Sequence, residues 1–132
     1  MTPTATGNVT VDVPTAKATD IAGNNNTAAT QLTRTADLTA PTVTLTSTSA
    51  ATVTGLFSAT ATFTEDVIGF DTTDITVANA TVGNLVAVDA KTYTFDVTPT
   101  ADGNVTVDIP AAKATDTAGN NNTAATQLTR TC

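Results

Sequence analysis

The chain of 132 residues has no histidine, no tryptophan and a single cysteine, Cys132. Without histidine there is no imidazole base to activate a serine or cysteine nucleophile, and zinc sites of the usual His/Cys type are excluded. Basic residues are also scarce, with five lysines and arginines against twelve aspartates and glutamates and a net charge of −7. This balance argues against nucleic acid and anionic membranes as partners, because both are negatively charged. We therefore expect a protein that is not an enzyme.

Long hydrophobic runs are lacking as well, so no segment is predicted to span a membrane, and aromatic residues make up only 4% of the chain. Threonine is abundant, at about a quarter of all residues, and valine is frequent. Both are β-branched and favour strands over helices. The composition therefore predicts an all-β protein with a modest core.

One stretch of the chain occurs twice. Thr2–Thr35 returns 96 residues later as Thr98–Thr131, with different residues at only four of 34 positions. A repeat of this length is the size of a small domain. We interpret the chain as a slice of a tandem array, in which residues 1–36 are the last third of one repeat and residues 37–131 are one complete repeat. The first expected partners are thus neighbouring repeats of the same chain.

The single cysteine stands outside this repeat. Cys132 occupies the position at which the first copy has Ala36, so the cysteine is foreign to the repeat unit. We interpret it as a terminal handle or a cloning scar rather than a catalytic thiol.

From Ala40 onward, apolar and polar residues alternate with period two between short turn segments, which is typical of an antiparallel β-sandwich. About seven strands are predicted, each with its apolar residues on one face. They cover Thr42–Thr48, Phe57–Thr64, Asp74–Ala78, the neighbourhood of Thr81–Val88, Thr92–Thr98, Asn104–Ile109 and the neighbourhood of Thr123–Thr129.

Several short phrases follow one another along residues 37–131: TAP at Thr39–Pro41, FTEDV at Phe63–Val67, GFD at Gly69–Asp71, VTP at Val97–Pro99 and DTAGN at Asp116–Asn120. In this order they resemble the bacterial Ig-like repeats of large cell-surface adhesins and biofilm-associated proteins. The resemblance implies an immunoglobulin-like sandwich at the bacterial cell surface. It further implies a stalk unit that holds a distal binding region, directed at a host surface or glycan, away from the cell.

Two other functions are compatible with the same residues. The polar loops at one end of the sandwich could bind a glycan or a host receptor directly. The domain could also be an accessory part of a secreted enzyme. Near-identical adjacent repeats favour the stalk, because a single binding surface seldom needs copies side by side.

Residues 1–36 carry the last strands of a repeat without the strands that would complete it. Two strands alone bury too little apolar surface to fold, which predicts a mobile tail. Because the tail nearly copies Thr98–Thr131, the alternative is strand swapping, in which it takes the same place in a sheet and the chain associates with itself.

The acidic residues are predicted to gather at one end of the sandwich. With alternating strand directions, three loops lie at the end where Asp37 enters: one carries Glu65, Asp66 and Asp71, one carries Asp89, and one carries Asp116 and Asn120–Asn122. Carboxylate and amide oxygens are the ligands of Ca²⁺, and the family resemblance points the same way, since some Ig-like adhesin arrays are rigidified by calcium. Asp37, Glu65, Asp66 and Asp116 are the candidate ligands. Asp-x-x-Gly-Asn is also ordinary turn chemistry, so solvated turns are the alternative.

Overall fold

The computed structural model describes all residues, Met1–Cys132, and divides them into two compact units, Met1–Thr39 and Ala40–Cys132. Apart from one short 3-10 turn, η1 (Thr72–Asp74), the regular elements are strands. No helix is long and apolar enough to cross a membrane.

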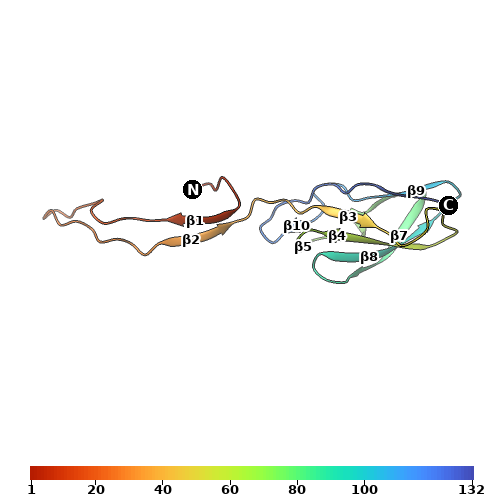
Figure 1. Cartoon of the computed structure of the whole chain (residues 1–132), viewed down its shortest axis with the longest axis horizontal. Coiled ribbons are helices and arrows are strands. Elements are labelled where there is room, and N and C mark those ends of the chain that lie inside the picture. The colour runs from red at the N-terminus through yellow and green to blue at the C-terminus, as the bar shows by residue number, and fades with distance from the viewer. The chain divides into compact units, whose positions relative to one another are not determined.

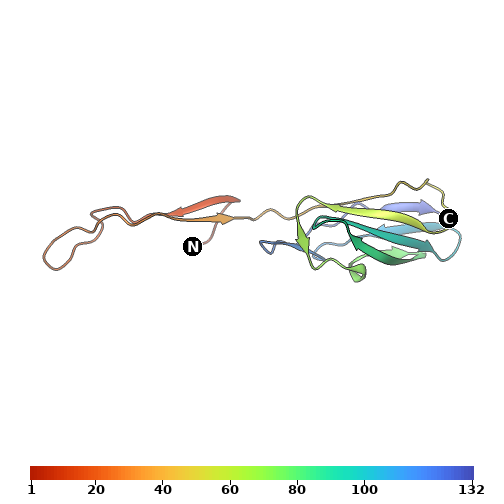
Figure 2. The ribbon, with the colours of Figure 1, turned by 90° about the horizontal axis from the view of Figure 1, so that it is seen from below.

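Unit 2, Ala40–Cys132, is a sandwich of two antiparallel sheets, which form two layers in Figures 1 and 2. One sheet has four strands in the order β3 (Val43–Thr46), β4 (Phe57–Phe63), β8 (Thr92–Pro99) and β7 (Ala80–Ala87). The other has three, in the order β11 (Leu128–Thr131), β9 (Asn104–Asp108) and β6 (Thr76–Ala78). The all-β, immunoglobulin-like sandwich predicted from the sequence is confirmed.

The alternation in the sequence decides which face of each strand is buried. Along β4, residues 57, 59, 61 and 63 are buried, whereas the serine and threonines between them are exposed or half-buried. β8 and β9 repeat the pattern, and Phe95, Val97, Val105 and Val107 are at most 1% exposed. These side chains meet between the two sheets, while threonines cover the outer faces.

Three aromatic rings close the core at the end of unit 2 where β4 ends. Phe63, Phe70 and Tyr93 pack edge to face, with ring centroids 4.9–5.9 Å apart. Such contacts add to the stabilisation that burial alone gives. A chain with few aromatic residues thus places three of its five in one cluster.

The last strand differs from the prediction. It was expected near Thr123–Thr129, but β11 begins only at Leu128. The amides of Thr123 and Ala125 donate instead to the carbonyls of Pro41 and Ile109, so this stretch crosses the sandwich without a regular ladder. Its sequence, TAATQLT, alternates only in part, and its long-range backbone bonds replace those of a regular strand.

Two strands of two residues each were not predicted. β5 (Val67–Ile68) pairs with β10 (Thr115–Asp116) in antiparallel register, with Asp116 opposite Val67. Figure 1 places this pair at the end of unit 2 away from the C-terminus. Two residues show no readable periodicity, so a ladder this short is invisible in the sequence.

Unit 1, Met1–Thr39, contains the hairpin of β1 (Gly7–Val11) and β2 (Leu32–Ala36) and the long connection between its strands. The strands pair from Gly7 opposite Ala36 to Val11 opposite Leu32. Every residue of this unit is exposed or half-buried.

Candidate functional site

The loop that follows β10 is shaped by the carboxylate of Asp116. Its Oδ1 accepts hydrogen bonds from the amides of Ala118 and Asn120, and its Oδ2 accepts one from Nδ2 of Asn120, each at 2.9 Å. Gly119 follows with φ of 96°, a conformation that glycine adopts without strain. The Asp-x-x-Gly-Asn phrase therefore forms the Asp-capped turn expected from its residues.

These hydrogen bonds also set the charge of Asp116. The side chain of Asn120, followed by the backbone amides of the turn, lowers the pKa of the Asp116 carboxyl below its usual value, against the opposing effect of desolvation. Asp116 thus stays ionised at neutral pH although the residue is only 2% exposed.

A second side chain holds the segment that leads into β10. Asn122 is 2% exposed, and its Oδ1 accepts from the amides of Lys113 and Ala114 at 2.8 Å. Its Nδ2 donates to the carbonyls of Pro110 and Thr123. Asn122 was predicted only as one of several polar loop residues. The one signal for its role is that the first copy has asparagine, Asn26, at the same position.

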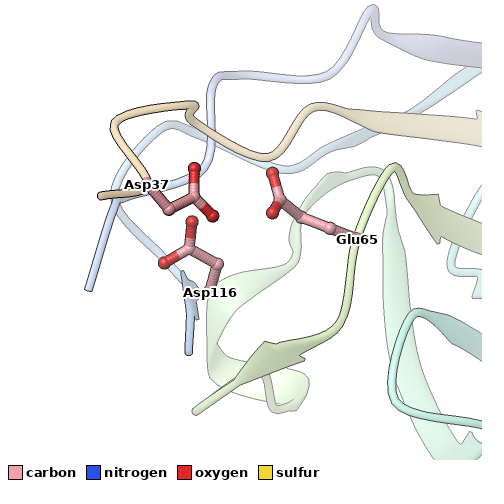
Figure 3. A group of neighbouring side chains, drawn as sticks. All are labelled: Asp37, Glu65 and Asp116. Atoms are coloured by element: carbon pink, nitrogen blue, oxygen red, sulfur yellow. The ribbon is translucent and has the colours of Figure 1, made fainter. Parts of the chain in front are cut away.

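The short ladder of β5 and β10 brings a second carboxylate toward Asp116. Glu65 lies between β4 and β5, two residues before the position opposite Asp116. Asp37 supplies a third from the segment that leads into β3. One carboxylate oxygen of each residue lies within 4.8 Å of the others, and Figure 3 shows the three groups pointing toward one another. Asp37 and Glu65 are half-buried.

The fourth candidate ligand, Asp66, does not belong to this group. It is exposed, and its charge acts on the hydroxyl of Tyr93. Burial raises the pKa of Tyr93, and the negative charges of Asp66 and then Asp89 raise it further. Of the four predicted ligands, the structure thus brings together Asp37, Glu65 and Asp116.

Two more carboxylates predicted at this end stabilise turns. Asp71 caps η1, accepting from the amide and hydroxyl of Thr73 at 2.7 and 2.5 Å, and these bonds lower its pKa. Asp89 accepts from the amide of Lys91 at 2.9 Å, which lowers the pKa of Asp89. Both therefore have a local structural role.

The group of three fits a hard cation by its donor chemistry. Ca²⁺ takes six to eight oxygen ligands at loosely defined angles, and carboxylates bind it through one or both oxygens. Three neighbouring carboxylates repel one another, and a bound cation would remove that cost.

Comparison with known proteins gives one match. A family model described as a bacterial Ig-like domain matches residues 37–131. No curated protein and no solved structure gives a significant match.

Proposed function

The chain belongs to the family of bacterial Ig-like domains, and from this membership we propose that it is a non-catalytic structural repeat of an extracellular, adhesin-type bacterial protein. In this function the folded unit is a spacer. It sets the distance between the cell and a distal region that contacts a host surface or glycan.

The near-exact duplication is the observation that carries this proposal. Thirty of 34 residues are the same in Thr2–Thr35 and Thr98–Thr131. A tandem array needs each unit to fold in the same way and to join the next in the same way. Its length then grows by one unit per repeat, without any unit needing a ligand.

The residue chemistry supports a non-catalytic function. Without histidine, and with its one cysteine outside the repeat, the chain lacks the groups that most often act as base and nucleophile. Three carboxylates at this end, those of Asp71, Asp89 and Asp116, are in addition held by turn hydrogen bonds. A local structural role leaves them poorly suited to proton transfer.

Scattering measurements on arrays of one to four 96-residue repeats test the spacer function. We expect the maximum dimension to rise by a constant increment with each repeat. An array that collapses, so that its maximum dimension stops growing, would contradict the proposal. Saturable binding of a single repeat to a glycan or receptor would favour the direct binding module instead.

We further propose that Asp37, Glu65 and Asp116 bind Ca²⁺. The three side chains come from the segment before β3, the β4–β5 connection and β10. A shared cation would fix these segments to one another. Because Asp37 lies in the segment that leads into the sandwich, calcium would stiffen that segment where a preceding repeat joins.

Thermal melting with calcium and with chelator tests the metal. A ligand that binds only the folded state stabilises it by about 2.7 kcal/mol at a hundredfold excess over Kd, which for a domain of this size raises the melting temperature by about ten degrees or more. Glu65→Gln should abolish the shift. Asp102→Asn, which removes an exposed carboxylate from the connection between β8 and β9, should keep it. A melting temperature that millimolar calcium leaves unchanged would refute the site.

A further inference from the structure

The hairpin β1–β2 presents an apolar face that unit 1 does not cover. Val9 and Val11 on β1 are only half-buried, and Leu32 on β2 is 48% exposed. A cavity of about 300 Å³ is lined by these three side chains together with Met1, Pro3 and Arg34. An apolar strand pair of this kind needs a second layer to exclude water.

The same hairpin exists in unit 2 with that layer in place. Asn104 pairs with Thr131 and Val107 with Leu128, which is the register of Asn8 with Thr35 and Val11 with Leu32. In unit 2, Val105 and Val107 are fully buried in the core shared with β4 and β8. The chain thus already contains the interface that fits the face of β1–β2.

Residues 2–35 keep nearly every side chain that this interface buries. Of the four positions that differ, only Val13 stands for a buried residue, Ile109, and the two differ by one methylene. The other three correspond to exposed residues. The buried residues of Thr98–Thr131 are Val105, Val107, Ile109, Ala114, Asp116 and Asn122, and their counterparts are Val9, Val11, Val13, Ala18, Asp20 and Asn26.

The long connection of unit 1 also has the conformation of its counterpart. Asn26 accepts from the amides of Lys17 and Ala18 at 2.8 Å, as Asn122 does from Lys113 and Ala114. Asp20 accepts from the amide and side chain of Asn24 at 2.9 Å, as Asp116 does from Asn120. A segment already held in its docked conformation loses less entropy on binding.

We infer that the apolar face of β1–β2 binds the four-stranded sheet β3–β4–β8–β7 of a second copy of this chain. It takes the place that Thr98–Thr131 of that copy otherwise fills. The main-chain partner is β6 and the apolar partners are the inward side chains of β4 and β8, as for the resident segment. Because the two segments are almost the same, an intact acceptor gains little by the exchange. A second copy that lacks Thr98–Thr131 has no resident segment to compete, so it binds the tail without exchange.

The test mixes the unlabelled full chain with an isotope-labelled acceptor fragment, residues 37–97. Alone, the fragment lacks β9, β10, β11 and the last two residues of β8, and it should give the narrow amide spectrum of an unfolded chain. With an excess of the full chain, we expect the dispersed spectrum of a folded β domain. A spectrum that stays narrow at every ratio would overturn the inference.

Two matched variants of the full chain locate the surface. Val11→Asp places a charge in the apolar face and should abolish folding of the fragment. Thr33→Asp adds the same charge where the counterpart, Thr129, is exposed, and should keep it. Both variants should retain the melting transition of the sandwich, which shows that the donor chain is intact. Equal folding with Val11→Asp and with the parent chain would overturn the inference.

A chain of residues 37–132, without the tail, is the remaining control. It should leave the fragment unfolded. If it folds the fragment as well as the full chain does, the fragment has taken Thr98–Thr131 from the sandwich, and the face of β1–β2 is not the docking surface.

Discussion

The two copies of one sequence in this molecule share their local structure and differ in their burial. In both, the side chain of an asparagine accepts hydrogen bonds from backbone amides of the long connection, and an aspartate caps the turn of five residues. Yet Asn26 is half-buried and Asp20 is exposed, while Asn122 and Asp116 are each 2% exposed. Within its own unit, only the second copy faces a four-stranded sheet.

The difference separates what a segment encodes locally from what the rest of the domain supplies. Hydrogen bonds between residues close in sequence give each copy its shape, because aspartate, asparagine and glycine favour these turns wherever they occur. Removal of apolar side chains from water gives the second copy its stability, and this needs the opposite sheet. Paired substitutions in the two copies measure the two contributions separately.

The largest expected effect comes from the apolar pair. Ile109 is 1% exposed, and its counterpart Val13 is 50% exposed. Ile109→Ala should lower the free energy of unfolding of the sandwich by about 2–5 kcal/mol, because it removes buried methyl groups and leaves a cavity. Val13→Ala should change it by less than about 0.5 kcal/mol. Urea titrations of both variants measure the difference. Similar losses would show that Val13 is buried too.

The asparagine pair should give a smaller difference. Asn122→Ala removes four hydrogen bonds and leaves backbone groups around a buried site without partners. A loss of about 1–3 kcal/mol is expected for the sandwich. Asn26→Ala breaks the same bonds in a solvated loop, where water replaces them, and should leave the unfolding of the sandwich unchanged. Thermal melts decide, and a sandwich destabilised equally by both changes would contradict the comparison.

The aspartate pair should give the smallest effect, visible only in acid. Hydrogen bonds from the Asn120 side chain lower the pKa of Asp116 in the folded state below its usual value of 3.8, and those from Asn24 do the same for Asp20. A lowered pKa stabilises the fold above pH 3.8, and this contribution is lost as the pH falls through the folded-state pKa.

Asp116→Asn should therefore flatten the decline of the melting temperature of the sandwich below about pH 4. Asp20→Asn should leave that decline as it is in the parent chain, since Asp20 lies outside unit 2. Melting temperatures at half-unit steps from pH 7 to pH 2 test both variants. An unchanged slope for Asp116→Asn would show that its hydrogen bonds do not couple to folding.

The fold was predictable because burial follows a simple alternation. In β4 and β8, apolar and polar residues change places at every step, so strand positions and inward faces could be predicted from the sequence. β11 was predicted to begin too early, because the amides of Thr123 and Ala125 bond to the carbonyls of Pro41 and Ile109 rather than to a neighbouring strand. Long-range backbone bonds of this kind leave no pattern in the sequence.

The candidate site was predictable only in outline. Strand order placed Asp37, Glu65 and Asp116 at one end of the sandwich, and the structure brings their carboxylates together. The predicted strand order could not separate Glu65 from its neighbour Asp66, because which of the two faces Asp116 depends on the two-residue ladder of β5 and β10. Whether the group holds calcium stays a prediction.

Amide hydrogen exchange at matched positions tests the central claim most directly. The amides of Ala18 and Ala114 donate to the side-chain oxygens of Asn26 and Asn122 at the same 2.8 Å, so the two differ in burial but not in local bonding. If the opposite sheet supplies the stability, Ala114 should exchange only when the sandwich unfolds, at least about a thousandfold more slowly than Ala18. Equal exchange rates at the two alanines would contradict the account.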